Sequence, residues 1–103
     1  MVKVILESPY AGDVEKNLEY ARLCMKDSLL RGESPIASHL LYTQVLDDTK
    51  LDERNLGIDA GLAWADHADK HVFYVDFGMS DGMKYAMDYA VENGEVIEMR
   101  MIL

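Results

Sequence analysis

The stretch from Ser80 to Met83 combines a helix-capping residue, a carboxylate and a glycine. If a helix begins here, its free backbone N–H groups and its dipole favour an anion such as a phosphate. Gly82 in the first turn costs the helix about 1 kcal/mol relative to alanine, which indicates a close approach to the backbone. The stretch is therefore a candidate anion site, although an ordinary helix cap with Gly82 making room for a neighbouring strand explains it equally well.

Two carboxylates follow apolar runs of the kind that form buried strands. Glu7 follows Val2–Leu6, and Asp76 follows Val72–Val75. An unpaired carboxylate at a buried strand end is costly, so Asp76 is expected to hold a ribose hydroxyl, to act as an acid or base, or to cap a turn. If the two strands are neighbours, both carboxylates face one cleft and can divide the roles of acid and base. The candidate catalytic residues are Glu7, Asp76 and Asp81.

Other polar and aromatic side chains are suited to a nucleotide. Tyr10, Tyr42 and Gln44 can stack on a base and hydrogen-bond to it, although loop aromatics more often form small local cores. Arg54 can contact a phosphate, in its own subunit or across a subunit boundary, or can simply be solvated on the first turn of a helix. The full set of candidate ligand-binding residues is Ser8, Pro9, Tyr10, His39, Tyr42, Gln44, Arg54, Asp76, Ser80, Gly82 and Met83.

Several common chemistries lack their motifs in this chain. No HxH, HExxH or Cys/His cluster is present, so neither a metal site nor a cofactor is expected. The sequence has no GxGxxG, Walker A or GxSxG motif, which argues against dinucleotide dehydrogenases, P-loop enzymes and serine hydrolases. Cys24 lies mid-helix without a facing basic residue and is expected to be an inert thiol.

Composition and charge narrow the possible partners. The chain has 103 residues and a formal net charge of −9, so one domain over residues 1–103 is expected, with no affinity for nucleic-acid polymers or anionic membranes. A free nucleotide remains compatible, because one helix N-terminus can hold a phosphate. A single cysteine fits a reducing compartment, and no run approaches the ~18 apolar residues of a membrane span. We expect a cytosolic protein, or host-cytosolic if a phage encodes it.

The elements that position these residues alternate between strands and helices. The runs Val2–Leu6 and Val72–Val75 are expected to be buried strands, Pro35–Ala37 a weak strand, and Ile97–Met101 a half-exposed strand near a sheet edge. Three amphipathic helices separate them. Their expected inward residues are Val14, Leu18, Ala21, Met25 and Leu29; Leu56, Ala60, Ala63 and His67, with Ile58 and Leu62 alongside; and Met83, Met87, Ala90 and Val91. In the second helix, Gly57 and Gly61 are expected to allow close packing on the sheet.

This order predicts a Rossmann-like, three-layer α/β sandwich with a small, mostly parallel sheet of four or five strands. Ligands of such sheets bind outside the carboxyl ends of the strands. The candidate site loops are therefore 7–13, 38–48 and 76–82. The small core, together with apolar side chains such as Leu40, Leu41, Tyr42, Leu62 and Trp64, also predicts a homodimer or a higher homo-oligomer.

Four blocks of the sequence resemble a group of small phage and prophage proteins. They are SPYAGD, ARLCMKDSLLRGESPIASHLLYTQ, ERNLGIDAGLAW and DFGMSDGM. The group is similar in layout to nucleoside 2-deoxyribosyltransferases, to 2′-deoxynucleoside 5′-monophosphate N-hydrolases and to the nucleotide-sensing SLOG domains. The resemblance implies that Ser8, Pro9 and Tyr10 belong to a nucleoside-binding loop, and that Asp76 or Asp81 supplies an acid.

One position departs from the transferase pattern. Where the resemblance implies a nucleophilic glutamate, this chain has Ala86. The expectation is therefore a nucleotide or nucleoside binder without turnover, such as a phage anti-defence protein that sequesters a host immune signalling nucleotide. The alternatives are a deoxyribosyltransferase-like enzyme or nucleotide N-glycosidase using Glu7, Asp76 or Asp81, and an interaction module with no ligand.

Overall fold

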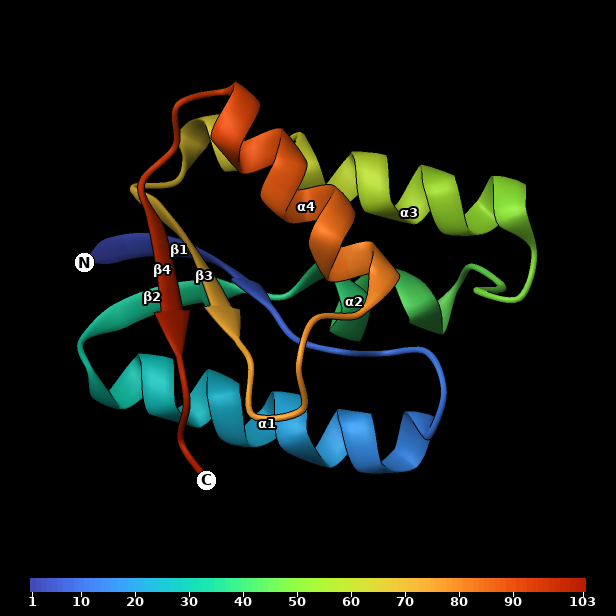
Figure 1. Ribbon diagram of the computed structural model, residues 1–103, viewed down its shortest axis with the longest axis horizontal. Coiled ribbons are helices and arrows are strands. Elements are labelled where there is room, and N and C mark those ends of the chain that lie inside the picture. Colours follow the sequence, from blue (N-terminus) through green and yellow to red (C-terminus); the bar gives the residue numbers. More distant parts are fainter.

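A computed structural model describes residues 1–103 and contains one four-stranded, entirely parallel sheet (Figure 1). The strands are β1 (Val2–Glu7), β2 (Glu33–Ile36), β3 (Lys70–Tyr74) and β4 (Ile97–Arg100), in the spatial order β2-β1-β3-β4. The predicted class of fold is confirmed, and β4 lies at a sheet edge as its alternating pattern indicated.

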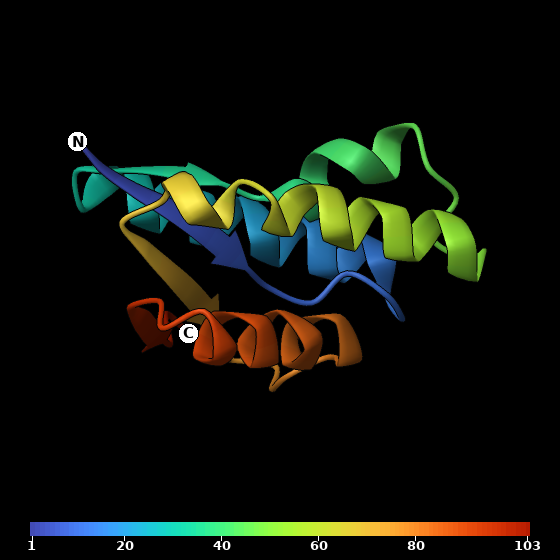
Figure 2. The same cartoon turned by 90° about the horizontal axis from the view of Figure 1, so that it is seen from above.

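The helices cover both faces of the sheet. Helix α1 (Val14–Leu30) lies on one face, and α3 (Leu51–Leu62) and α4 (Asp81–Glu92) lie on the other (Figures 1 and 2). The stretch 38–46, which follows neither the helical nor the strand period, forms the short helix α2 (Ser38–Leu41) and a 3-10 turn over Tyr42–Gln44. None of the helices is long and apolar enough to cross a membrane.

Strand alternation divides the core into two clusters. On the α1 face, Val72 and Tyr74 of β3 pack with Leu6 and Tyr20. On the opposite face, Phe73 packs with residues of α3 and α4, including Met83. Neighbouring β3 residues therefore face different layers, and this alternation decides which strand-end side chains can meet.

The buried face of α1 differs from the expected stripe. Val14 and Leu29 are exposed, while the buried residues are Asn17, Tyr20, Ala21, Cys24 and Ser28. Three of these are polar or carry a hydroxyl, and each finds a hydrogen-bond partner. Asn17 donates to the carbonyls of Tyr10 and Ala11, for example. Ala21 is buried and Met25 packs against the core as expected. Because satisfied polar groups are tolerated inside a protein, apolar spacing alone missed the polar residues of this face.

The inward faces of the other two helices are also corrected in part. In α3, Leu56 is 59% exposed, whereas Leu62 is buried and Ile58 packs beside it, as expected of the residues alongside the stripe. In α4, Met83 and Ala90 are buried as expected, but Val91 is exposed. The helix surfaces that meet the core are narrower than the apolar stripes.

Gly57 and Gly61 do allow close packing, but against α2 and its 3-10 turn rather than the sheet. A Cβ atom at Gly61 would lie 2.7 Å from Ser38 Cβ, and one at Gly57 would lie 3.8 Å from Tyr42 Cβ. The close contact draws α2 against α3 along one side of the pocket described below.

An ion cluster on the α1 face joins the two edge strands. Glu33 of β2 accepts two hydrogen bonds from Arg100 of β4, at 2.6 and 2.8 Å. Lys70 of β3 lies 2.9 Å from the same carboxylate, and Ser28 donates to it at 2.7 Å. These bonds, those from Arg100 foremost, lower the pKa of Glu33 to about 2.

Candidate functional site

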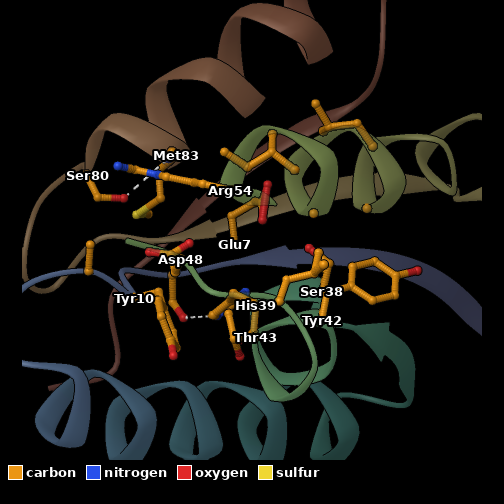
Figure 3. Close-up of a pocket in the computed structure, with 18 of the residues that line it drawn as sticks. Glu7, Tyr10, Ser38, His39, Tyr42, Thr43, Asp48, Arg54, Ser80 and Met83 are labelled. Carbon is orange, nitrogen blue, oxygen red and sulfur yellow. Dashed lines mark hydrogen bonds between the residues drawn. The ribbon is translucent and has the colours of Figure 1, made fainter. Parts of the chain in front are cut away.

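A pocket of about 90 Å³ opens at the carboxyl edge of the sheet. Its walls come from the end of β1 and the loop after it, from α2 and its 3-10 turn, from α3, and from the first turn of α4 (Figure 3). Ligand sites of parallel α/β sheets lie at this edge. The pocket is therefore at the edge of the sheet where the sequence predicted the site.

Glu7, the last residue of β1, lies centrally in the pocket (Figure 3). Its side chain is 15% exposed, and its Oε2 lies 3.2 Å from Nε2 of the buried His71. The pocket thus has a carboxylate in its interior, supported from behind by an imidazole.

His39 and Ser8 form a hydrogen-bonded pair beside Glu7. Ser8 Oγ lies 2.7 Å from His39 Nε2. Burial lowers the pKa of His39, and the nearby Glu7 only partly offsets this. His39 is therefore mainly neutral at pH 7, and Ser8 and His39 offer the pocket uncharged polar atoms.

Two tyrosines lie on the same side of the pocket as His39 (Figure 3). Tyr10 comes from the loop after β1 and Tyr42 from the turn after α2. The hydroxyl of Tyr42 accepts a hydrogen bond from Trp64 Nε1 at 3.3 Å, which ties the turn to the chain beyond α3. Both side chains are partly buried, so each presents an aromatic surface that a flat ligand can cover.

On the opposite side of the pocket, Arg54 extends toward Ser80 and Met83 (Figure 3). Ser80 caps α4, its Oγ accepting a hydrogen bond from the backbone N–H of Met83 at 3.3 Å. Arg54 takes part in none of the salt bridges of the chain. A guanidinium and a helix N-terminus therefore lie together, and both favour an anion.

Gly82 also lines the pocket, and a Cβ atom there would meet nothing within 4 Å. No neighbouring strand requires glycine at this position, in contrast with the packing explanation considered from the sequence. The Cβ position of Gly82 is open space, and the residue borders the pocket.

Four of the candidate residues lie outside the pocket: Pro9, Gln44, Asp76 and Asp81. Asp76 accepts hydrogen bonds from Tyr20 Oη and from the backbone N–H groups of Ile102 and Leu103. Burial raises the pKa of Asp76, but these hydrogen bonds outweigh burial and the net shift is downward. Its carboxylate holds the end of the chain.

Glu7 and Asp76 do not converge on one cleft, even though β1 and β3 are neighbours. Glu7 is in register with Phe73 and faces α3 and α4. Asp76 instead bonds to Tyr20 on the α1 face. Residues paired across two strands share a face of the sheet, and successive residues alternate between faces. Glu7 is paired with Phe73, and Asp76 is three residues further along, so the two carboxylates lie on opposite faces.

Further residues that line the pocket were not predicted. They are Ile5, Ala11, Ser38, Thr43, Leu46, Asp48, Glu53, Gly57, Ile58, Gly61 and Leu62. Ser38 and Asp48 bound one of the candidate loops, which was the available signal for that wall. Arg54 was the only α3 residue selected from the sequence, because the contact of Gly61 with Ser38, which brings the rest of α3 to the pocket, has no local signal. No group of three or more His, Cys, Asp or Glu side chains is placed to hold a metal ion.

The parallel sheet, the two covering helix layers and the pocket at the strand ends define a Rossmann-like α/β domain. Within that class, the chain belongs to the family described as domain of unknown function DUF7768, whose model matches residues 2–100. No curated protein sequence matches the chain.

Two solved structures share the fold. One is the 2-deoxyribosyltransferase of Bacillus psychrosaccharolyticus, with a TM-score of 0.68 and 15% identity over 97% of this chain and 72% of that one. The other is the 2-desoxiribosyltransferase of Leishmania mexicana, with a TM-score of 0.53 and 17% identity over 98% of this chain and 65% of that one. The expected likeness in layout to nucleoside 2-deoxyribosyltransferases is confirmed at the level of the fold.

Proposed function

We propose that the pocket binds a nucleoside or nucleotide, with its base on the tyrosine side and any phosphate between Arg54 and the start of α4. The observation that carries this proposal is the division of the pocket into two chemically different ends. Aromatic side chains lie on one side, and a guanidinium with a helix N-terminus lies on the other (Figure 3). A nucleotide has the same division between a flat base and an anionic phosphate.

The charge of the whole chain strengthens the argument for a local phosphate site. At −9, the overall field repels anions, so a phosphate must be held by local groups. Arg54 and the capped N-terminus of α4 provide such groups, and Arg54 is not occupied by a carboxylate. The fold shared with two deoxyribosyltransferases supports a ligand of the nucleoside class.

The form of this function that we favour is binding without turnover, as in sequestration of a signalling nucleotide. Ala86 supports it, because this residue is 1% exposed and belongs to the core under α4 rather than to the pocket. The position at which the resemblance implies a nucleophilic glutamate thus holds a small core residue.

An enzyme that cleaves or transfers at the N-glycosidic bond is the second candidate, and the place of Glu7 favours it. Of the three candidate catalytic carboxylates, Glu7 lines the pocket whereas Asp76 and Asp81 do not. An enzyme of this kind would rely on Glu7 as its acid, base or nucleophile.

Isothermal titration calorimetry with nucleosides, mononucleotides and cyclic dinucleotides tests the proposal. We expect a binder, and we expect Gly82→Leu to weaken its binding at least tenfold, because Gly82 lines the pocket and the backbone there has room for a side chain. Val91→Leu, on an exposed site of the same helix, is the matched control and should bind normally. Equal binding by the Gly82 variant would place the site elsewhere. Release of free base, followed by chromatography, would select the enzyme over the binder.

A further inference from the structure

His71 is completely buried and lies between two carboxylates. Its Nε2 is 3.2 Å from Glu7 Oε2, and its Nδ1 is 3.1 Å from Glu95 Oε1. The ring also stacks on Phe73, with centroids 4.8 Å apart and an interplanar angle of 15°. The three side chains form one line that begins in the loop before β4 and ends inside the pocket.

This geometry selects the doubly protonated form of His71. A neutral imidazole has one N–H and one acceptor nitrogen, so it can donate to only one of two carboxylates. The imidazolium donates to both. Burial lowers the pKa of His71, but the hydrogen bonds and charges of Glu7 and Glu95 outweigh it, so the pKa lies above its ordinary value.

The surroundings of His71 contain few other charges. Glu7 faces it from β1 and Glu95 from the loop before β4, and the stacked Phe73 adds none. On the α4 side, Tyr89 lies near Glu95 and also interacts with Asp66. His71 is thus the cationic partner of both glutamates in this part of the fold.

Glu7 and Glu95 each have one carboxylate oxygen that makes no hydrogen bond, and these two oxygens have different surroundings. Glu95 Oε2 is buried and has no hydrogen-bond partner, so it gives Glu95 no second anchor. Glu7 uses Oε2 for His71, and its other oxygen accepts no hydrogen bond within the protein. Because Glu7 lines the pocket, that oxygen is available to a ligand.

We propose that His71 and Glu95 are positioning residues that orient the Glu7 carboxylate, so that its free oxygen accepts hydrogen bonds from the sugar hydroxyls of a nucleoside. The inference rests on the proposed function and adds which part of the ligand Glu7 contacts. An ionised carboxylate accepts hydrogen bonds and donates none, so it favours a ligand with hydroxyl groups over one without them.

The first test follows the charge of His71 by NMR in the ligand-free protein. We expect its ring to titrate above 6.5, the ordinary imidazole value. The Glu95→Gln variant should titrate lower by about one pH unit, because one of the two charge partners is lost. Glu92→Gln, on the exposed end of α4, is the matched control and should leave the titration unchanged. A neutral His71 ring at pH 6 in the unmodified protein would overturn the proposal.

The second test measures binding of adenosine and thymidine and of their 2′,3′-dideoxy counterparts. The hydroxyl-bearing probe should bind at least tenfold more tightly, and Glu7→Gln should remove most of that preference. Affinity should also fall as the pH rises through the His71 midpoint, because the neutral ring donates to only one of the two carboxylates and no longer always orients Glu7. The fall should begin at lower pH in Glu95→Gln. A merely structural role for Glu95 would not move this profile.

The outcomes separate the inference from the proposed function. If a probe binds with no preference for hydroxyl groups, the inference fails and the proposed function stands. If no nucleoside or nucleotide binds, the proposed function fails together with the assigned ligand contact. The NMR titration then still decides whether the His71 ring is charged between Glu7 and Glu95.

Discussion

Replacing Glu33 by glutamine should destabilise the protein by about 3 kcal/mol at pH 7. The side chain of Glu33 is 6% exposed and accepts hydrogen bonds from Arg100, Lys70 and Ser28. Its pKa is about 2 in the folded chain against an ordinary 4.5, and at 1.36 kcal/mol per pH unit this difference corresponds to about 3 kcal/mol. The glutamine side chain has the same shape, but its amide N–H₂ must face a cation, and Arg100 loses its carboxylate partner.

The sign of the pH dependence follows from the lowered pKa. The contribution of Glu33 is complete above its unfolded pKa of about 4.5 and is lost as the pH falls toward 2. Urea denaturation of both proteins between pH 3 and pH 7 should therefore show a gap in unfolding free energy that narrows on acidification. Glu98→Gln is the control, since this residue touches the same Lys70 and Arg100 but is 43% exposed, and it should cost less than about 1 kcal/mol. A gap for Glu33→Gln that is as small as the control, or that is constant with pH, would refute the reasoning.

Further measurements address other parts of the fold. Gly61→Ala should lower the unfolding free energy by about 1–3 kcal/mol in chemical denaturation, because the new Cβ clashes with Ser38, whereas a neutral effect would show that α2 yields freely. Asp76→Ala should increase hydrogen exchange at the last residues of the chain, and unchanged exchange would mean that the tail has other anchors. Cys24 should resist thiol reagents in the native protein, because burial raises its pKa to about 12; rapid labelling would contradict this. Light scattering should give a mass above 11.7 kDa, because Leu41 and Trp64 of the expected apolar surface are exposed, although Leu62 is buried; a monomer mass would disprove the expected homo-oligomer.

The sequence predicted the strands correctly where burial alone determines which residues are apolar. The runs at Val2–Leu6 and Val72–Val75 are apolar because their strands lie in the middle of a parallel sheet, and the structure confirms both, with slightly different bounds. The alternation after Ile97 likewise identified the edge strand β4. Once the parallel sheet was inferred, its carboxyl edge followed as the place of the site, which is how Tyr10 and Ser80 were selected.

The sequence was less informative where polar groups are buried in pairs. The bonds from Tyr20 to Asp76 and from His71 to Glu7 join residues more than fifty positions apart, and no local period reveals them. When these hydrogen bonds are not known, Asp76 has the sequence features of a site residue. His71 then has only those of a residue at the start of a strand. The face of the sheet on which a strand-end side chain lies depends on how the strands pair, and the order of residues along the chain does not reveal that pairing.

The ion cluster around Glu33 also bears on the kinetics of folding. Glu33 and Arg100 are separated by 67 positions and belong to the two edge strands, β2 and β4. Because β1 and β3 lie between those edges, we expect this contact to form late in folding. Interactions that form after the transition state slow unfolding and leave the folding rate almost unchanged. The cluster is therefore expected to lower the unfolding rate and so to prolong the lifetime of the native state.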